Sequence, residues 1–106
     1  MGKPEAYVED YLRRRCKQID GCICYKWISG VIGVPDDIVV IHGHVLMVEC
    51  KSKTGKCSQM QEQQQKKLVE CGADVRVVHT REAVDEMLAE FEDKKYRKRQ
   101  VINDYD

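Results

Sequence analysis

Three residues near the middle of the chain, Asp36, Glu49 and Lys51, are of the types that support metal-dependent hydrolysis. Glu49 and Lys51 follow an apolar run at residues 45–48, and the alternation of side chains along a strand would set both on one face. Two carboxylates that converge at a sheet edge repel each other unless a hard cation such as Mg²⁺ binds them. With a lysine beside them, they could hydrolyse a phosphodiester. The Glu-x-Lys spacing also occurs on ordinary solvated strands, so the spacing alone leaves both interpretations open.

A predicted hairpin brings the two carboxylates together. Residues 38–42 and 45–50 form two apolar runs joined at Gly43, which is typical of a hairpin turn. If the strands pair around that turn, the start of the first lies beside the end of the second. Asp36 then lies close to Glu49.

The remaining elements follow from hydrophobic spacing and capping signals. They are an amphipathic helix over 5–19, a strand over 22–28, a helix capped by Ser58 with Gln61 in a capping box and ending at Gly72, a strand over 75–78, and a last helix capped by Thr80. The predicted order is α-β-β-β-α-β-α. Because a strand–helix–strand unit returns as a parallel crossover, this order predicts an α/β fold with a mixed central sheet flanked by helices.

Composition limits the class of protein. A chain of 106 residues suffices for one domain, and its charged fraction of 34% excludes a membrane-spanning protein. The first residues do not have the pattern of a signal peptide, so we expect an intracellular, cytoplasmic protein. The six cysteines match no zinc-binding spacing, and we expect them to be reduced and to pack as small apolar residues.

The net charge of zero conceals a segregation of charge. Every charged residue from Glu82 to Asp93 is acidic, whereas residues 94–99 are almost entirely basic. We therefore expect one domain over 1–93 and a basic C-terminal extension over 94–106, whose order the sequence leaves open. A basic run is either a solvated surface or a nucleic-acid contact.

A series of short motifs covers most of the chain. They are Gly33-Val34-Pro35-Asp36, Glu49-Cys50-Lys51, Ser58-Gln59-Met60-Gln61 and the glycine-then-valine segment at 72–78. In order and spacing, over about residues 7–88, the chain resembles the VRR-NUC family of the PD-(D/E)xK nuclease superfamily, and in particular its compact stand-alone type from bacteriophages and bacteria. The resemblance implies a restriction-endonuclease-like α-β-β-β-α-β core and a DNA endonuclease that depends on Mg²⁺, for which Mn²⁺ can substitute.

The resemblance also implies roles for particular residues. Asp36 and Glu49 would bind the metal together with the main-chain carbonyl of Cys50, and Lys51 would be the catalytic lysine. Gln61 would position that lysine or the scissile phosphate.

A helix-borne carboxylate belongs to the same family pattern. Glu9 would fill this place as a catalytic and metal-binding residue, with Glu5 as its rival. Asp37 departs from the pattern, and since alternation sets it opposite Asp36, we expect it to be a surface residue. Three lysines would contact DNA: Lys26, Lys53 and Lys56.

The expected partner is DNA, with no small-molecule substrate and no membrane. Relatives of this type imply selectivity for branched DNA such as four-way junctions and action as a homodimer, which pairs two active sites about a twofold axis. The alternative is a catalytically silent nuclease-fold module that binds DNA or a protein.

Overall fold

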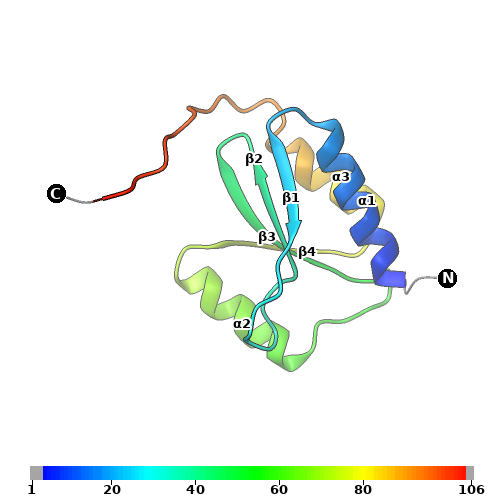
Figure 1. Cartoon of the computed structure of the whole chain (residues 1–106). Coiled ribbons are helices and arrows are strands. Elements are labelled where there is room, and N and C mark those ends of the chain that lie inside the picture. The colour runs from blue at the N-terminus through cyan, green and yellow to red at the C-terminus, as the bar shows by residue number, and fades with distance from the viewer. Residues whose placement is uncertain (1–3, 105–106) are drawn as a thin grey trace.

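The computed structural model describes residues 4–104, which form three helices and four strands (Figure 1). In chain order these are α1 (Pro4–Gln18), β1 (Cys22–Lys26), β2 (Asp37–Ile41), β3 (His44–Cys50), α2 (Gln59–Glu70), β4 (Asp74–Val78) and α3 (Arg81–Ala89). The predicted order is confirmed. The largest shift in a boundary is at β1, which ends at Lys26 instead of continuing to residue 28.

The four strands form one mixed sheet in the order β1-β2-β3-β4. Strands β1 and β3 both pair antiparallel with β2, whereas β4 joins β3 in parallel, as a crossover through α2 requires. The predicted α/β architecture with a mixed central sheet is therefore confirmed.

A two-residue turn sets the register of the β2–β3 hairpin. His42 and Gly43 both have positive φ, 45° and 85°, as a type I′ turn requires. The register pairs Ile41 with His44 at the turn and Asp37 with Val48 at the open end. One step further along the same register, Asp36 lies opposite Glu49, as the hairpin prediction requires.

Helices α1 and α3 cover one face of the sheet, and the core lies between these layers (Figure 1). Its side chains come from α1 (Val8, Leu12, Cys16), β2 (Val39, Ile41), β3 (Leu46, Val48, Cys50), β4 (Val78) and the α3 region (Val84, Met87, Leu88, Phe91). Asp37 lies on this covered face and is 0% exposed, so the prediction of a surface residue is wrong. Alternation correctly separated Asp37 from Asp36, but did not identify which face the helices cover.

The opposite face of the sheet is only partly covered. Helix α2 contacts β4, and none of its residues is buried. The side chains that this arrangement leaves exposed on the other strands are Ile23 and Tyr25 of β1, Val40 of β2 and Val45 of β3. No helix of residues 4–104 combines the length and the apolar character that crossing a membrane requires.

The basic extension begins at the hairpin turn. Residues 94–104 contain no helix or strand, but the ring of Tyr96 stacks on the ring of His42, with centroids 5.2 Å apart. Farther along, Val101 is 85% exposed.

All six cysteines are free. Cys16 and Cys50 lie in the core, in keeping with the expected role as small apolar residues. Cys71 is exposed at the end of α2 and does not have that role.

Candidate active site

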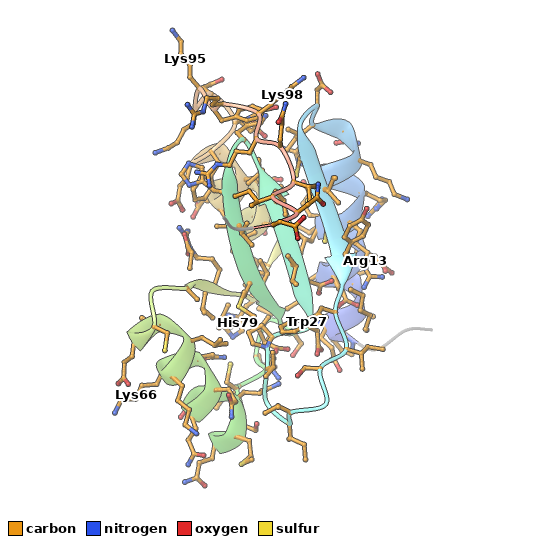
Figure 2. All side chains as sticks on the ribbon, turned by 60° about the vertical axis from the view of Figure 1, so that its left-hand side comes forward. Arg13, Trp27, Lys66, His79, Lys95 and Lys98 are labelled. Atoms are coloured by element: carbon orange, nitrogen blue, oxygen red, sulfur yellow. The ribbon has the colours of Figure 1, made fainter. Side chains whose placement is uncertain are left out.

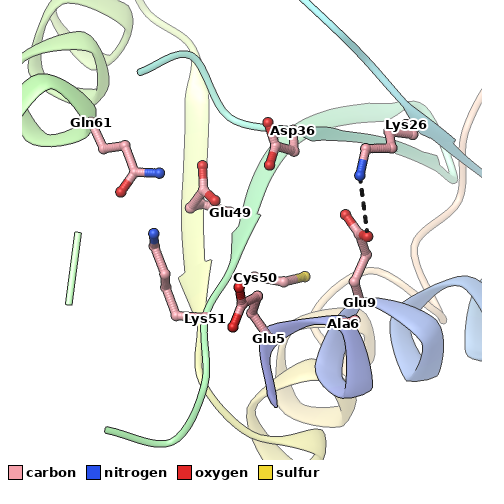
Figure 3. Close-up of a pocket in the computed structure, with 9 residues that line it drawn as sticks. All are labelled: Glu5, Ala6, Glu9, Lys26, Asp36, Glu49, Cys50, Lys51 and Gln61. Atoms are coloured by element: carbon pink, nitrogen blue, oxygen red, sulfur yellow. Dashed lines mark ion pairs between the residues drawn. The ribbon is translucent and has the colours of Figure 1, made fainter. Parts of the chain in front are cut away.

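A cleft of about 420 Å³ opens where β2 begins and β3 ends, beside the first turns of α1 (Figure 3). Its lining residues are Glu5, Ala6, Glu9, Lys26, Asp36, Glu49, Cys50, Lys51 and Gln61. The structure thus brings together, from four separate elements and the loops beside them, most of the residues that the sequence singled out. Lys53 and Lys56 do not line the cleft; both are exposed on the loop that follows β3.

Asp36 and Glu49 form the acidic centre of the cleft, and they differ in their surroundings. Asp36 is exposed, whereas Glu49 is 3% exposed and its Oε1 atom has no hydrogen-bond partner among the described residues. Burial, followed by the nearby Asp36 charge, raises the pKa of Glu49 to about 7. A buried carboxylate with a free oxygen, beside a second carboxylate, is an arrangement that a cation would stabilise.

Lys51 extends from the end of β3 on the same side as Glu49 (Figure 3). Its amide donates to the carbonyl of Val78 at 2.9 Å, so the pairing of β3 with β4 continues one residue past Cys50. This pairing keeps the strand geometry in which residues two apart share a face. The Lys51 ammonium opposes the rise in the pKa of Glu49, which fits its position beside that carboxylate.

The main chain of Cys50 faces the cleft, because Cys50 lines it while its thiol side chain is buried in the core. Continuing the hairpin register two steps beyond Asp37 and Val48 sets Pro35 opposite Cys50. Proline has no N–H to donate. The Cys50 carbonyl consequently has no strand partner on that side and is free to accept from, or bind, a group in the cleft.

Gln61 reaches the cleft from the first turn of α2. Its amide N–H donates to Ser58 Oγ at 3.1 Å, and its side-chain Oε1 accepts from the Ser58 amide at 2.9 Å, which completes the predicted capping box. Because Oε1 is engaged, the Nε2 amide group remains to face Lys51 and Glu49 (Figure 3). The cap of α2 therefore also orients a hydrogen-bond donor in the cleft.

Glu9 approaches the cleft from α1, within a network of charged groups. Its Oε1 lies 3.4 Å from an Arg13 nitrogen and 3.6 Å from Lys26 Nζ. A hydrogen bond with Asp37 lowers the pKa of Glu9, and the charges of Arg13 and Lys26 lower it further. Glu5, the rival carboxylate, also lines the cleft but is exposed.

Asp37 is the supporting residue that the sequence reasoning missed. Burial, together with the hydrogen bond to Glu9, raises the pKa of Asp37 to about 8, so this carboxyl is protonated at neutral pH. Arg13 donates to Asp37 Oδ1 at 3.3 Å, and Oδ2 is buried without a donor facing it. A protonated Asp37 carboxyl that donates to Glu9 accounts for the raised pKa of Asp37 and the lowered pKa of Glu9. Asp37 consequently holds Glu9 from the core side of the sheet.

The donors in the cleft suit a hard divalent cation that keeps part of its water shell. No group of three or more His, Cys, Asp or Glu side chains in residues 4–104 is arranged to hold a metal ion. Asp36, Glu49 and the Cys50 carbonyl provide only oxygen ligands, and Mg²⁺ is commonly bound by one or two carboxylates with several waters. These residues fit Mg²⁺, and Glu9 would act on such an ion through water.

Comparison with known proteins concerns the fold as a whole. A solved structure described as a VRR_NUC domain matches with a TM-score of 0.75 and 26% sequence identity, over 83% of this chain and 97% of that chain. Scans against models of protein families and against curated proteins find no match. The match covers the fold of this chain, an α/β core with a four-stranded mixed sheet. The match therefore supports the resemblance of this chain to VRR-NUC nuclease domains.

Proposed function

We propose that the protein is an endonuclease that uses Mg²⁺, or Mn²⁺ in its place, to hydrolyse phosphodiester bonds of DNA. One observation carries the proposal: the buried Glu49 carboxylate, with its Oε1 unpartnered, lies beside Asp36 and Lys51 in a single cleft. A buried carboxylate without a partner destabilises a fold unless a ligand offsets its charge. A phosphodiester and its metal ion provide such a ligand.

Each lining residue has a distinct role in this proposal. Asp36, Glu49 and the Cys50 carbonyl hold the cation, which when bound supplies polarisation of the phosphoryl oxygen and a lowered pKa for the attacking water. Lys51 donates a hydrogen bond from Nζ that orients the water and offsets charge on the phosphate.

Gln61 and Glu9 form hydrogen bonds to groups around the reacting atoms. The Nε2 group of Gln61 donates to a phosphate oxygen or to the water held by Lys51. Glu9 would act on a bound cation through water, and its ion pair with Lys26 limits the motion of both side chains. Lys26, Lys53 and Lys56 contact phosphates on either side of the cut.

The proposed substrate is branched DNA, and the proposed active form is a homodimer. Each chain has one such cleft and would cut one strand, so a twofold pair would cut both strands of a symmetric junction. The exposed apolar side chains on the uncovered face of the sheet, Ile23 and Tyr25 among them, are available for pairing of two copies. Sedimentation equilibrium should give twice the mass of one chain; a monomer at micromolar concentration would contradict the dimer.

Cleavage of matched four-way, flap and linear duplex DNA, with and without Mg²⁺, tests the activity. The variants Lys51→Ala and Asp36→Asn should each lower the rate at least about 10³-fold, because each removes about 4 kcal/mol or more of transition-state stabilisation. Lys66→Ala is the matched control, since Lys66 lies on α2 outside the cleft (Figure 2). Near wild-type cleavage by Lys51→Ala would contradict the assigned site.

Calorimetric titration with Mg²⁺ separates the nuclease from the alternative of a silent binding module. The nuclease should bind Mg²⁺ with a heat that Asp36→Asn abolishes. DNA binding with neither cleavage nor carboxylate-dependent Mg²⁺ binding would instead favour the silent module.

A further inference from the structure

The loop between β1 and β2 presents apolar side chains to solvent beside the cleft. Ile28 is 85% exposed, Val31 54% and Ile32 75%, and none belongs to the core. Surface loops of this length are ordinarily polar, since exposed apolar side chains add nothing to stability. The stability of the fold therefore does not explain why the side chains at the tip of this loop are apolar.

Both ends of this loop are fixed at the cleft. Lys26 ends β1, Asp36 precedes β2, and both line the cleft. The amide of Trp27 donates to the carbonyl of Asp36 at 2.6 Å, which holds the two ends of the loop together. In Figure 1 the loop continues beyond the ends of β1 and β2 and passes beside α2.

The returning limb of the loop rests on the first turn of α2. Gly33 has φ +95°, and a Cβ atom there would lie 2.5 Å from the carbonyl oxygen of Met60, so only glycine permits this contact. The next residue of α2, Gln61, lines the cleft. Near the tip, the Val31 amide donates to Ser29 Oγ at 3.0 Å, which shapes the turn. The loop is therefore held in place against both sides of the cleft.

We propose that Ile28, Val31 and Ile32 form an apolar wedge that inserts between bases of the DNA whose phosphate lies in the cleft. This inference rests on the proposed function, and it assigns to that site its preference for DNA with interrupted stacking. Lys26 at one end of the loop, and Lys51 and Lys53 after β3, favour a negatively charged partner such as a phosphate backbone over a basic or neutral one.

The physical basis is the cost of unstacking. Apolar side chains of DNA-binding proteins insert at base steps and kink the duplex, and they do so at the expense of stacking energy. That expense is smallest where bases are mismatched or already single-stranded. A wedge beside the scissile phosphate consequently selects branch points, where stacking is already interrupted, over continuous duplex.

Fluorescence of 2-aminopurine at the branch point of a four-way junction tests the wedge directly. The titration is made in EDTA at low salt, so that metal-dependent cleavage does not occur. Wild-type protein should raise the fluorescence as the base unstacks. The triple variant Ile28→Ser, Val31→Ser, Ile32→Ser should lose most of this rise, with an unchanged unfolding midpoint because all three side chains are exposed. The control is Val69→Ser, which changes an exposed apolar residue of α2 outside the cleft and should keep the rise.

A cleavage assay with Mg²⁺ gives the second readout. The triple variant should cut the four-way junction at least about tenfold more slowly, and should recover to within about twofold of wild type on a substrate with unpaired bases at the cut. An equal loss on both substrates would overturn the wedge, because it would show that the loop acts on catalysis or on general binding.

Other outcomes separate the wedge from the nuclease. If the triple variant unstacks and cleaves like wild type, the wedge is wrong and the nuclease remains. If wild type unstacks the junction in a loop-dependent way but no divalent metal supports cleavage, the nuclease is wrong and the wedge remains. Wild-type protein that binds no DNA would overturn the wedge. A triple variant that changes from dimer to monomer would also overturn it, because this would show that the loop contacts a second copy.

Discussion

The two ends of the β2–β3 hairpin both contain buried or stacked polar groups, but they differ in how those groups are satisfied. At the turn, His42 Nδ1 lies 2.7 Å from the carbonyl of Phe91 and Nε2 lies 2.8 Å from the carbonyl of Asp20. Since carbonyls only accept, both contacts are hydrogen bonds only when both ring nitrogens carry a proton, so they favour the imidazolium form and raise the pKa of His42. At the open end, the Oε1 atom of Glu49 has no partner among the described residues.

This difference distinguishes a structural cluster from a functional one. At the turn end, the His42 ring joins the hairpin to the turn between α1 and β1 and to the segment after α3, and each ring nitrogen has a partner. The open end leaves a carboxylate without a partner, which costs stability unless a ligand is bound. Functional sites are expected where buried polar groups lack hydrogen-bond partners within the protein. The two ends of the hairpin can be tested against that expectation.

The largest expected effect is from Glu49→Gln, which should lower Mg²⁺-dependent cleavage at least about 10³-fold, since it removes a metal-binding carboxylate worth several kcal/mol. The same change should stabilise the metal-free protein at pH 8 by about 1–2 kcal/mol, because the buried charge is lost. Urea unfolding in EDTA measures the second effect. A variant that is both inactive and less stable at pH 8 would show that Glu49 is a structural residue.

The pH dependence provides the control for this prediction. The folded pKa of Glu49, about 7, is raised above its unfolded value, so the carboxyl favours folding below an unfolded pKa of about 4.3 and this contribution is lost as pH rises through 7. The stability difference between Glu49→Gln and wild type should therefore shrink from pH 8 to pH 5. Added Mg²⁺ should stabilise wild type alone.

The next effect concerns the core side of the open end. Asp37→Leu should destabilise the fold by about 3 kcal/mol, because it leaves Arg13 and Glu9 without their buried partner. Asp37→Asn should lie within about 1 kcal/mol of wild type, since an amide can both donate to Glu9 and accept from Arg13. Equal losses in the two variants, measured by urea unfolding, would indicate that Asp37 acts as a charged carboxylate.

Much of the fold follows from signals within short segments. Gly43 between two apolar runs specified the hairpin, and Ser58 with Gln61 specified the start of α2. The hairpin then brought Asp36 and Glu49 into one cleft, because register follows from the turn. These parts were predictable because residues close in sequence determine them.

The parts that could not be predicted depend on packing between distant elements. Alternation sets Asp37 opposite Asp36, but only the docking of α1 makes that face the buried one. His42 similarly looks like an ordinary exposed residue of a turn, since its two carbonyl partners, on Asp20 and Phe91, come from segments far away in the chain. Short-range patterns do not encode either contact.

The smallest expected effect is at the turn end, where His42→Asn removes the imidazolium and keeps a residue that tolerates positive φ before Gly43. Hydrogen bonds to the carbonyls of Asp20 and Phe91 raise the pKa of His42, so its contribution to stability is complete below the unfolded pKa of about 6.5 and is lost as pH rises through the higher folded pKa. The destabilisation by His42→Asn should be greater at pH 6 than at pH 9, as measured by urea unfolding, and Mg²⁺-dependent cleavage should be unchanged. A pH-independent loss would mean that stacking against Tyr96, and not the charge, is what His42 contributes. A loss of cleavage without a loss of stability would contradict the separation of the two ends, because it would give the satisfied cluster a part in function.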